Sequence, residues 1–210
     1  MKKVKIILTA GLLLVRWFFA FSQSQSYDVN WLIGYSTNIF KEKPFQGLSI
    51  IQFTNDGILN NLLKENTKLD LDYSFDYSCM SDYSGNFMMY TNGCKILNAN
   101  CELMLNGDSI NPGHLWDSYE GEYYPVQNGT LFLPHPTDTG LYYLLHKGTS
   151  IVKVGIGGYY LPDVLYYSTI DRRLDVGLGA VTQKNEVLIR DSLNESQMAA
   201  CRHANGRDWW

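Results

Sequence analysis

The chain has 210 residues, of which 45% are hydrophobic, 14% aromatic and 18% charged, and its formal net charge is −4. This length is enough for one domain with a core, and 15 Tyr and 18 Gly against only 6 Pro favour turn-rich β-structure over a helical bundle. An acidic chain lacks the basic surface that nucleic acid requires, which excludes a nucleic-acid partner.

Residues 1–22 are predicted to be a signal peptide. Lys2, Lys3 and Lys5 precede an apolar run at 6–15, and small residues before Gln23 predict cleavage there. Four of the 17 basic residues and none of the 21 acidic ones lie in this leader, so the mature chain would carry a net charge of −8. The run is shorter than the roughly 20 residues of a membrane-spanning helix. We expect an exported protein, secreted or on the outer cell surface, with no transmembrane segment in residues 23–210.

The first half of the mature chain contains short apolar runs bounded by turn residues. We expect strands at residues 31–35, 48–53, 71–77, 87–90, 94–97 and 102–105. Residues 58–69 fit either a short helix or an extended loop, because their periodicity does not distinguish the two. Short strands separated by Asn, Asp and Gly turns predict an antiparallel meander.

The same pattern returns after residue 125. Further strands are expected at residues 129–133, 141–146, 165–170 and 186–190, and the Gly155–Gly158 segment is expected to be a turn at a strand end. Repeated short meanders are typical of propeller blades of four strands each. The fold prediction is therefore all-β, with residues 23–210 forming a partial β-propeller of two to three blades that is incomplete at its C-terminus.

The last residues also contribute to this prediction. Asn205-Gly206 is a strong turn signal, and Trp209-Trp210 after it is typical of the start of a buried strand. We expect the chain to stop where a strand begins, with Asp208 accepting from Arg207 or His203 and one Trp filling a core between blades.

Several strings together resemble a known group of proteins. They are SDYSGNFMMYTNGC at residues 81–94, LYYSTID at 165–171, GLGAV at 177–181, Lys184-Asn185, and RHANGRDWW at 202–210. This set resembles the N-terminal propeller region of large secreted Bacteroidota proteins that carry type IX secretion sorting or gliding-motility-associated C-terminal domains. The resemblance implies a WD-repeat or YVTN-like β-propeller that continues beyond residue 210 in a longer protein. It implies no catalytic residues.

Residues 114–124 form a loop rich in acidic and aromatic side chains. The candidate binding residues are Trp116, Asp117, Tyr119, Glu120 and Glu122, which could bind a glycan or a protein ligand if their rings form a contiguous patch. The carboxylate spacing matches no full metal loop, so no metal or other cofactor is expected, and a solvated acidic loop is the simpler interpretation.

Cysteine and histidine residues offer further candidates. Cys94 and Cys101 flank a turn and could form a hairpin disulfide in an oxidising compartment, or they could be small buried hydrophobes. His135, His146 and His203 are candidate bases, but no nucleophile elbow accompanies them.

Two functional hypotheses follow. The first is a secreted, non-catalytic propeller used for binding, adhesion or display of appended modules. The alternative is a secreted hydrolase or lyase, active on carbohydrate, that uses the loop at residues 114–124. Carboxylates at a fixed separation would be needed for glycoside hydrolysis.

Overall fold

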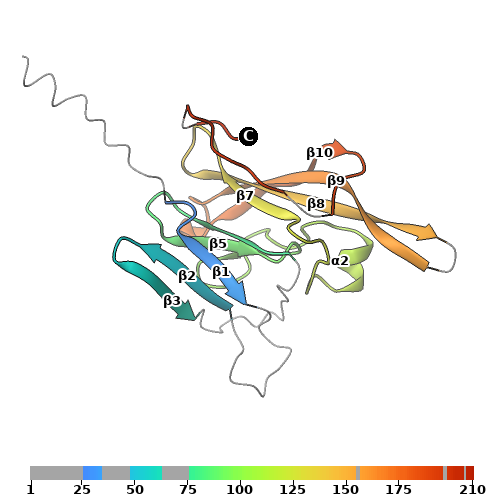
Figure 1. Cartoon of the computed structure of the whole chain (residues 1–210), viewed down its shortest axis with the longest axis horizontal. Helices are drawn as coiled ribbons and strands as arrows, with labels where there is room; N and C mark the ends of the chain where they lie inside the picture. Colours follow the sequence, from blue (N-terminus) through green and yellow to red (C-terminus); the bar gives the residue numbers. More distant parts are fainter. Residues whose placement is uncertain (1–25, 35–47, 63–75, 155–156, 196–197, 206) are drawn as a thin grey trace, which may run out of the picture.

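The computed structural model describes residues 26–34, 48–62, 76–154, 157–195, 198–205 and 207–210. These residues form three antiparallel sheets in chain order with very little helix, which confirms the all-β prediction (Figure 1). The predicted signal peptide and most of the strand expected at residues 71–77 lie outside the described residues.

The first sheet has the order β1-β2-β3, with β1 at Asn30–Gly34, β2 at Leu48–Thr54 and β3 at Gly57–Leu62. The helix or loop expected from residue 58 is wrong for β3, which pairs with β2 from Thr54↔Gly57 to Ser49↔Leu62. Gly57 has φ +136°, a conformation that favours glycine, and the turn before it returns the chain onto β2. Pairing with β2 therefore decides what the periodicity left open.

The second sheet has the order β4-β5-β6, with β4 at Ser78–Ser81, β5 at Phe87–Thr91 and β6 at Ile96–Asn98. The strand expected at residues 102–105 is reduced to isolated bridges, Leu97↔Leu103 and Leu105↔Ala180. The reason is local, since the Asn98 side chain accepts backbone N–H groups from Asn100 and Glu102 and holds a tight turn.

The third sheet has the order β10-β9-β8-β7 and follows a short helix, α2 at His114–Ser118. Its strands are β7 at Thr130–Pro134, β8 at Leu141–Val154, β9 at Gly157–Asp171 and β10 at Ala180–Arg190, with the 3₁₀ turn η1 at Asp175–Gly177. β8 and β9 are much longer than expected, because they stay paired as far as Val154↔Gly157. Gly157 and Gly158, expected in a turn, are the first residues of β9.

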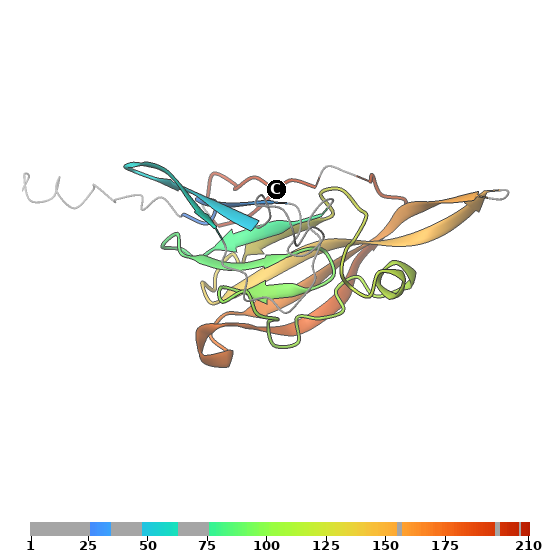
Figure 2. The ribbon, with the colours of Figure 1, turned by 90° about the horizontal axis from the view of Figure 1, so that it is seen from below.

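The three sheets lie in layers, with the β4-β5-β6 sheet in the middle (Figure 2). One face of the middle sheet packs Met80, Met89 and Ile96 against residues such as Phe132 and Leu144 of the third sheet. Its other face packs Tyr90, Leu97 and Cys79 against Leu32 and Ile50 of the first sheet. Each fully buried side chain of this kind stabilises the fold by about 1.5–3 kcal/mol. The described residues form an open stack of three meanders and no closed ring of sheets.

The first strands of the three meanders are neighbours. β1 lies against β4, and β4 lies against β7, although no backbone ladder joins them in the described residues. The main-chain N–H of Ser81 bonds the carbonyl of Tyr27, just before β1, and the Asn30 side chain bonds the Ser81 hydroxyl. Strands that begin each meander therefore gather at one place, whereas β3, β6 and β10 lie at the opposite edges of their sheets.

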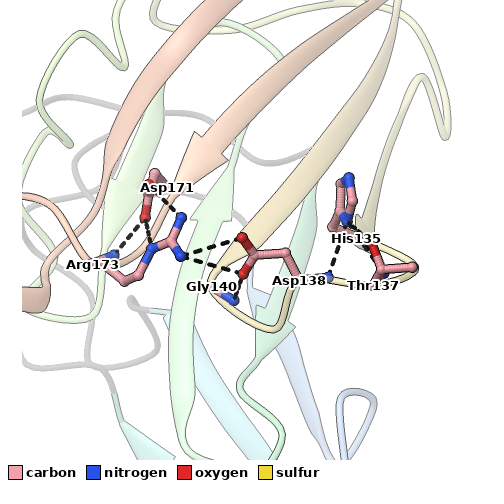
Figure 3. A network of polar contacts seen from close by, with 6 residues as sticks. All are labelled: His135, Thr137, Asp138, Gly140, Asp171 and Arg173. Atoms are coloured by element: carbon pink, nitrogen blue, oxygen red, sulfur yellow. Dashed lines mark hydrogen bonds and ion pairs between the residues drawn. The ribbon is translucent and has the colours of Figure 1, made fainter.

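A surface ion-pair network fixes the turn between β7 and β8 to the end of β9 (Figure 3). Arg173 bonds Asp171 at 2.8 Å and reaches Asp138 at 3.2 Å. His135 Nδ1 accepts the backbone N–H groups of Thr137 and Asp138. His135 is thus engaged in a turn, and the network is structural.

The C-terminal segment forms a small antiparallel arm rather than opening a buried strand. Cys201 and Trp210 exchange both backbone hydrogen bonds, and Arg202 bridges Trp209. Asp208 accepts from Arg207 at 2.8 Å, as expected. Trp210 is 75% exposed and Trp209 is half-buried, so the expectation of a Trp filling a core is wrong for Trp210.

Candidate functional site

A groove of about 790 Å³ lies at the place where the first strands gather. It is lined by residues of β1, β4 and β7, by the residues just before β1 and β4, and by the C-terminal arm. Such a volume falls in the range of small-molecule sites, about 300–1,000 Å³. The groove therefore depends on all three meanders and on no single segment of the chain.

Four aromatic side chains line the groove and keep part of their surface in solvent, and one of them, Tyr27, is half-buried. Trp31 on β1 is 55% exposed, Tyr77 is 42% exposed, and Trp209 is half-buried. The Trp31 indole N–H donates to the Asp28 carbonyl, and its ring meets Phe53 edge-on at 5.0 Å between centroids. The Trp209 indole N–H donates to the Pro134 carbonyl at the end of β7. Both indoles are thus held by hydrogen bonds while ring surface stays accessible.

The free edge of β1 is capped by a thiol. The backbone N–H of Phe53 in β2 donates to the Val29 carbonyl. Because the backbone groups of successive residues in an antiparallel strand point in alternate directions, those of Asn30 and Leu32 point away from β2. The Cys79 thiol donates to the Asn30 carbonyl at 3.3 Å, and Leu32 hydrogen-bonds the same sulfur from its backbone. Burial raises the pKa of this thiol. Cys79 thus occupies the backbone groups that a neighbouring strand would otherwise pair with.

The free edge of β7 is capped in a similar way at both ends. Thr130 at its start donates from its backbone N–H and its hydroxyl to Asp76, at 3.1 and 2.8 Å. Pro134 at its end accepts from the Trp209 indole at 3.2 Å. Side chains therefore protect these edges against pairing with another chain.

Few polar groups are available in the groove. Asp28 and Arg202 are the charged residues among its described lining, and their charges are opposite. The Arg202 guanidinium lies 5.9 Å from the Trp209 ring centroid, which is within cation–π range. The Ser78 hydroxyl is buried at the groove and has no hydrogen-bond partner in the part of the chain that the structure describes. The accessible surface of the groove therefore combines ring faces with a balanced pair of charges.

The acidic and aromatic loop does not form a comparable site. Asp117, Glu120 and Glu122 are all exposed to solvent. Trp116 and Tyr119 are half-buried and pack on a small cluster around Leu115 and Tyr124. A side chain at Gly121 would lie 3.0 Å from the Trp116 ring, which shows how closely the backbone approaches that ring. The candidate binding residues at 114–124 thus divide into solvated carboxylates and rings used for packing.

A serine, a histidine and an asparagine form a hydrogen-bonded chain that resembles a catalytic triad in its connections. Asn111 donates from its amide to the Gly93 carbonyl, so its oxygen accepts the Nδ1 proton of His146 at 2.7 Å. His146 Nε2 is then free to accept from the Ser168 hydroxyl at 2.9 Å.

This chain is closed to solvent. His146 and Ser168 are 0% exposed and Asn111 is 1% exposed. Desolvation lowers the pKa of His146 to about 3. The backbone of Asn185 donates to Ser168, which joins β10 to the same chain. Since no substrate can reach the serine, the arrangement holds the sheets together and does not act as a nucleophile.

Asp76 is the second buried ionisable group of interest. It is 2% exposed, and its Oδ2 atom has no partner among the described residues. Burial raises its pKa to about 7, although hydrogen bonds from Thr130 and the charge of Lys147 oppose that rise. Asp76 directly precedes the groove residue Tyr77 in the chain, and its carboxylate lies close to the backbone of Gly93 and Gly129.

The cysteines are all free thiols, so of the two alternatives for Cys94 and Cys101 the disulfide is not formed in this structure. Cys94 packs with Leu115 and Tyr124, whereas Cys101 packs with Tyr90 and Leu97. The two residues therefore lie in different clusters, because the turn at Asn98 does not lead into a second paired strand. The interpretation as small buried hydrophobes describes them better.

Sequence reasoning missed the groove because its parts are distant in the chain. Trp31 lies in a short apolar run that gives no sign of its exposed face, and Tyr77 closes an alternating segment assigned to a strand. The sequence pattern predicts a core position for Trp209 or Trp210 and gives no sign of a groove. The available signal was the presence of Trp31 and Tyr77 near the start of the first two meanders.

Among the described residues, no group of three or more His, Cys, Asp or Glu side chains could hold a metal ion. No helix in the described ranges is both long and apolar enough to span a membrane. Neither the family models, nor the curated proteins, nor the solved structures include a match to this chain.

Proposed function

We propose that this protein is an exported, non-catalytic binding protein whose meanders are consecutive blades of a β-propeller. The support is topological. Each sheet is an antiparallel meander in chain order, each packs face to face on the next, and the first strands β1, β4 and β7 adjoin. In a propeller the blades surround a central channel, and these are the contacts that neighbouring blades make.

The groove is the observation that carries the binding function. Its indole rings are oriented by hydrogen bonds to backbone carbonyls, yet Trp31 remains more than half exposed. Concave sites with accessible aromatic surface and a few convergent polar groups are the usual form of ligand sites. The position of the groove at the first strands is also the position of the channel in the proposed propeller.

The alternative of a hydrolase or lyase has less support. Its carboxylates at Asp117, Glu120 and Glu122 lie on the surface, and the cavity described above is lined by other segments. The Ser168–His146–Asn111 chain has catalytic connections but is closed to solvent. We therefore favour binding over chemistry.

The proposed origin and export follow from the sequence strings. We propose that the protein is related to the propeller regions of Bacteroidota surface proteins handled by type IX secretion, and that residues 1–22 direct it across the inner membrane. Expression in a Bacteroidota host, with N-terminal sequencing of the exported product, tests this directly. A product that begins at Gln23 supports export, and a chain retained in the cytoplasm with Met1 intact contradicts it.

Binding is tested by incubating the purified protein on glycan and peptide arrays. We expect at least one class of ligand to bind, and we expect binding to fall with Trp31→Ala, which removes the most exposed ring of the groove. The matched control carries Asp117→Asn, Glu120→Gln and Glu122→Gln and should bind normally. Arrays that stay blank, or binding that depends on the control residues instead, would overturn the proposed site.

A further inference from the structure

We propose that the ligand of the groove is a neutral oligosaccharide, an inference that rests on the proposed binding function and names its ligand class. The strongest competing occupant is an extended peptide, which would bind by adding a strand to a free sheet edge. The contacts around the groove distinguish between the two.

The edges facing the groove are poor templates for an added strand. On β1 the Asn30 carbonyl and the Leu32 backbone are both engaged by the Cys79 sulfur. On β7 the two terminal residues are engaged by Asp76 and by the Trp209 indole. A peptide strand gains its affinity from such backbone groups, so edges at which these positions are already engaged offer it less.

The exposed surface of the groove suits a sugar instead. The C–H face of a pyranose ring is flat and apolar, and it packs well on an aromatic ring. Trp31 and Trp209 are oriented without any ligand, because their indole N–H groups bond the carbonyls of Asp28 and Pro134. Tyr77, which is 42% exposed, adds a third ring from the segment before β4. Rings oriented in advance lose little conformational entropy on binding.

The polar groups of the groove match hydroxyl groups. Asp28 accepts and Arg202 donates. Because the two charged residues are of opposite sign, the groove has no net charge that would favour an acidic or a basic ligand.

The size of the groove sets the length of the ligand. At about 790 Å³ it lies in the upper part of the range for small-molecule sites. It is also bordered by aromatic residues of three separate segments. We therefore expect binding to strengthen as the oligosaccharide is lengthened over the first few sugar units.

The experiment measures binding of the full exported chain to neutral cello-, xylo-, manno- and malto-oligosaccharides of defined length by titration calorimetry. We expect at least one series to bind, and Trp31→Ala to weaken it about tenfold, the loss typical of a central aromatic contact. Trp31→Phe should retain most of the affinity. Trp210→Ala is the matched control, since Trp210 is 75% exposed and does not line the groove. Far-UV circular dichroism and the unfolding midpoint should stay the same in all three variants.

The outcomes separate this inference from the proposed function. If peptides bind in a manner that needs Trp31 and no neutral sugar does, the groove is a binding site but the ligand class is wrong. If a sugar binds and Trp31→Ala has no effect on its affinity, the groove is not its site and the inference is wrong. If neither sugars nor peptides bind, the proposed function is contradicted as well.

Discussion

The groove and the loop at residues 114–124 both bring together aromatic and charged side chains, but they use them in opposite ways. In the loop, Trp116 packs over the backbone at Gly121, and the carboxylates extend into solvent. In the groove, the indoles of Trp31 and Trp209 are held through their N–H groups, and ring surface stays accessible. A binding site therefore requires accessible, oriented ring faces, and a high density of aromatic residues along the sequence is not enough.

The largest expected effect concerns the Ser168–His146–Asn111 chain, in which Asn111 lies just before the loop in the sequence. The pKa of His146 is lowered to about 3, below its ordinary value near 6.5. Its stabilising contribution is therefore complete above pH 6.5 and is lost as the pH falls toward 3. The loss amounts to about 5 kcal/mol, at 1.36 kcal/mol for each unit of pKa difference.

His146→Gln isolates this contribution. The quantity to follow is the unfolding free energy of the wild-type protein minus that of the variant. We expect this difference to fall by about 5 kcal/mol as the pH is lowered from 6.5 to 3. Urea denaturation at a series of pH values measures both proteins under the same conditions. A difference that does not change with pH would show that His146 is not buried as a neutral base.

Asp76, which directly precedes the groove residue Tyr77, provides the next largest effect. Its pKa is raised to about 7 in the folded state, from 3.8. The unfolded chain releases this proton at a lower pH than the folded protein does. The stabilising contribution of Asp76 is therefore complete below pH 3.8 and is lost as the pH rises to 7. The total loss is about 4 kcal/mol.

Asp76→Asn removes the titration while keeping the shape of the side chain. We expect the unfolding free energy of the variant, relative to that of the wild-type protein, to increase by about 4 kcal/mol as the pH rises from 3.8 to 7. Urea denaturation measures both proteins. His146 changes stability in the opposite sense over much of this range, so differences between variant and wild type are needed. A constant difference between the two proteins contradicts the burial of Asp76.

A smaller effect tests whether the loop is structural. Gly121 has φ +70°, and a Cβ there would approach the Trp116 ring and Lys95 at 3.0 and 3.1 Å. We expect Gly121→Ala to lower the unfolding free energy by about 2 kcal/mol, from the left-handed conformation and the close contact. Thermal unfolding measures the loss, and ligand binding at the groove should be unaffected at temperatures well below the midpoint. Reduced binding with unchanged stability would instead place the loop in the ligand site.

The smallest effect is expected for the loop carboxylates. Asp117→Asn, Glu120→Gln and Glu122→Gln together should change the unfolding free energy by no more than about 0.5 kcal/mol each, because these side chains are exposed. Binding should also be unchanged. Loss of an enzymatic or binding activity in this variant would reverse the comparison between the two regions.

Much of the strand pattern could be predicted because it is local. The turns at residues 91–93 and around Gly57, and the runs that became β5, β7 and β2, carry strong Asn, Gly and β-branched signals. Predictions failed where a tertiary partner decided the outcome. β3 forms because it pairs with β2, and Leu105, expected in a strand at residues 102–105, bridges Ala180 of the third sheet beyond the tight turn that Asn98 holds.

The candidate site was much less predictable. The loop at residues 114–124 is a candidate site from sequence because its aromatic and acidic residues are adjacent in the chain. Adjacency does not determine which ring faces stay exposed. The groove residues Trp31, Tyr77 and Trp209 are far apart in the sequence and belong to different segments. Their proximity depends on the stacking of the sheets, which no single segment encodes.

The amino-acid sequence alone predicts antiparallel strands joined by tight turns, because those preferences act within a few residues, but it does not predict the full length of β8 and β9. The tertiary structure alone decided that β1, β4 and β7 meet at one groove, that a thiol and an indole cap their free edges, and that a Ser–His–Asn chain is closed to solvent. These features depend on contacts between residues that are tens of positions apart. Burial and hydrogen-bond partners, and not residue type, decided which side chains are available to a ligand.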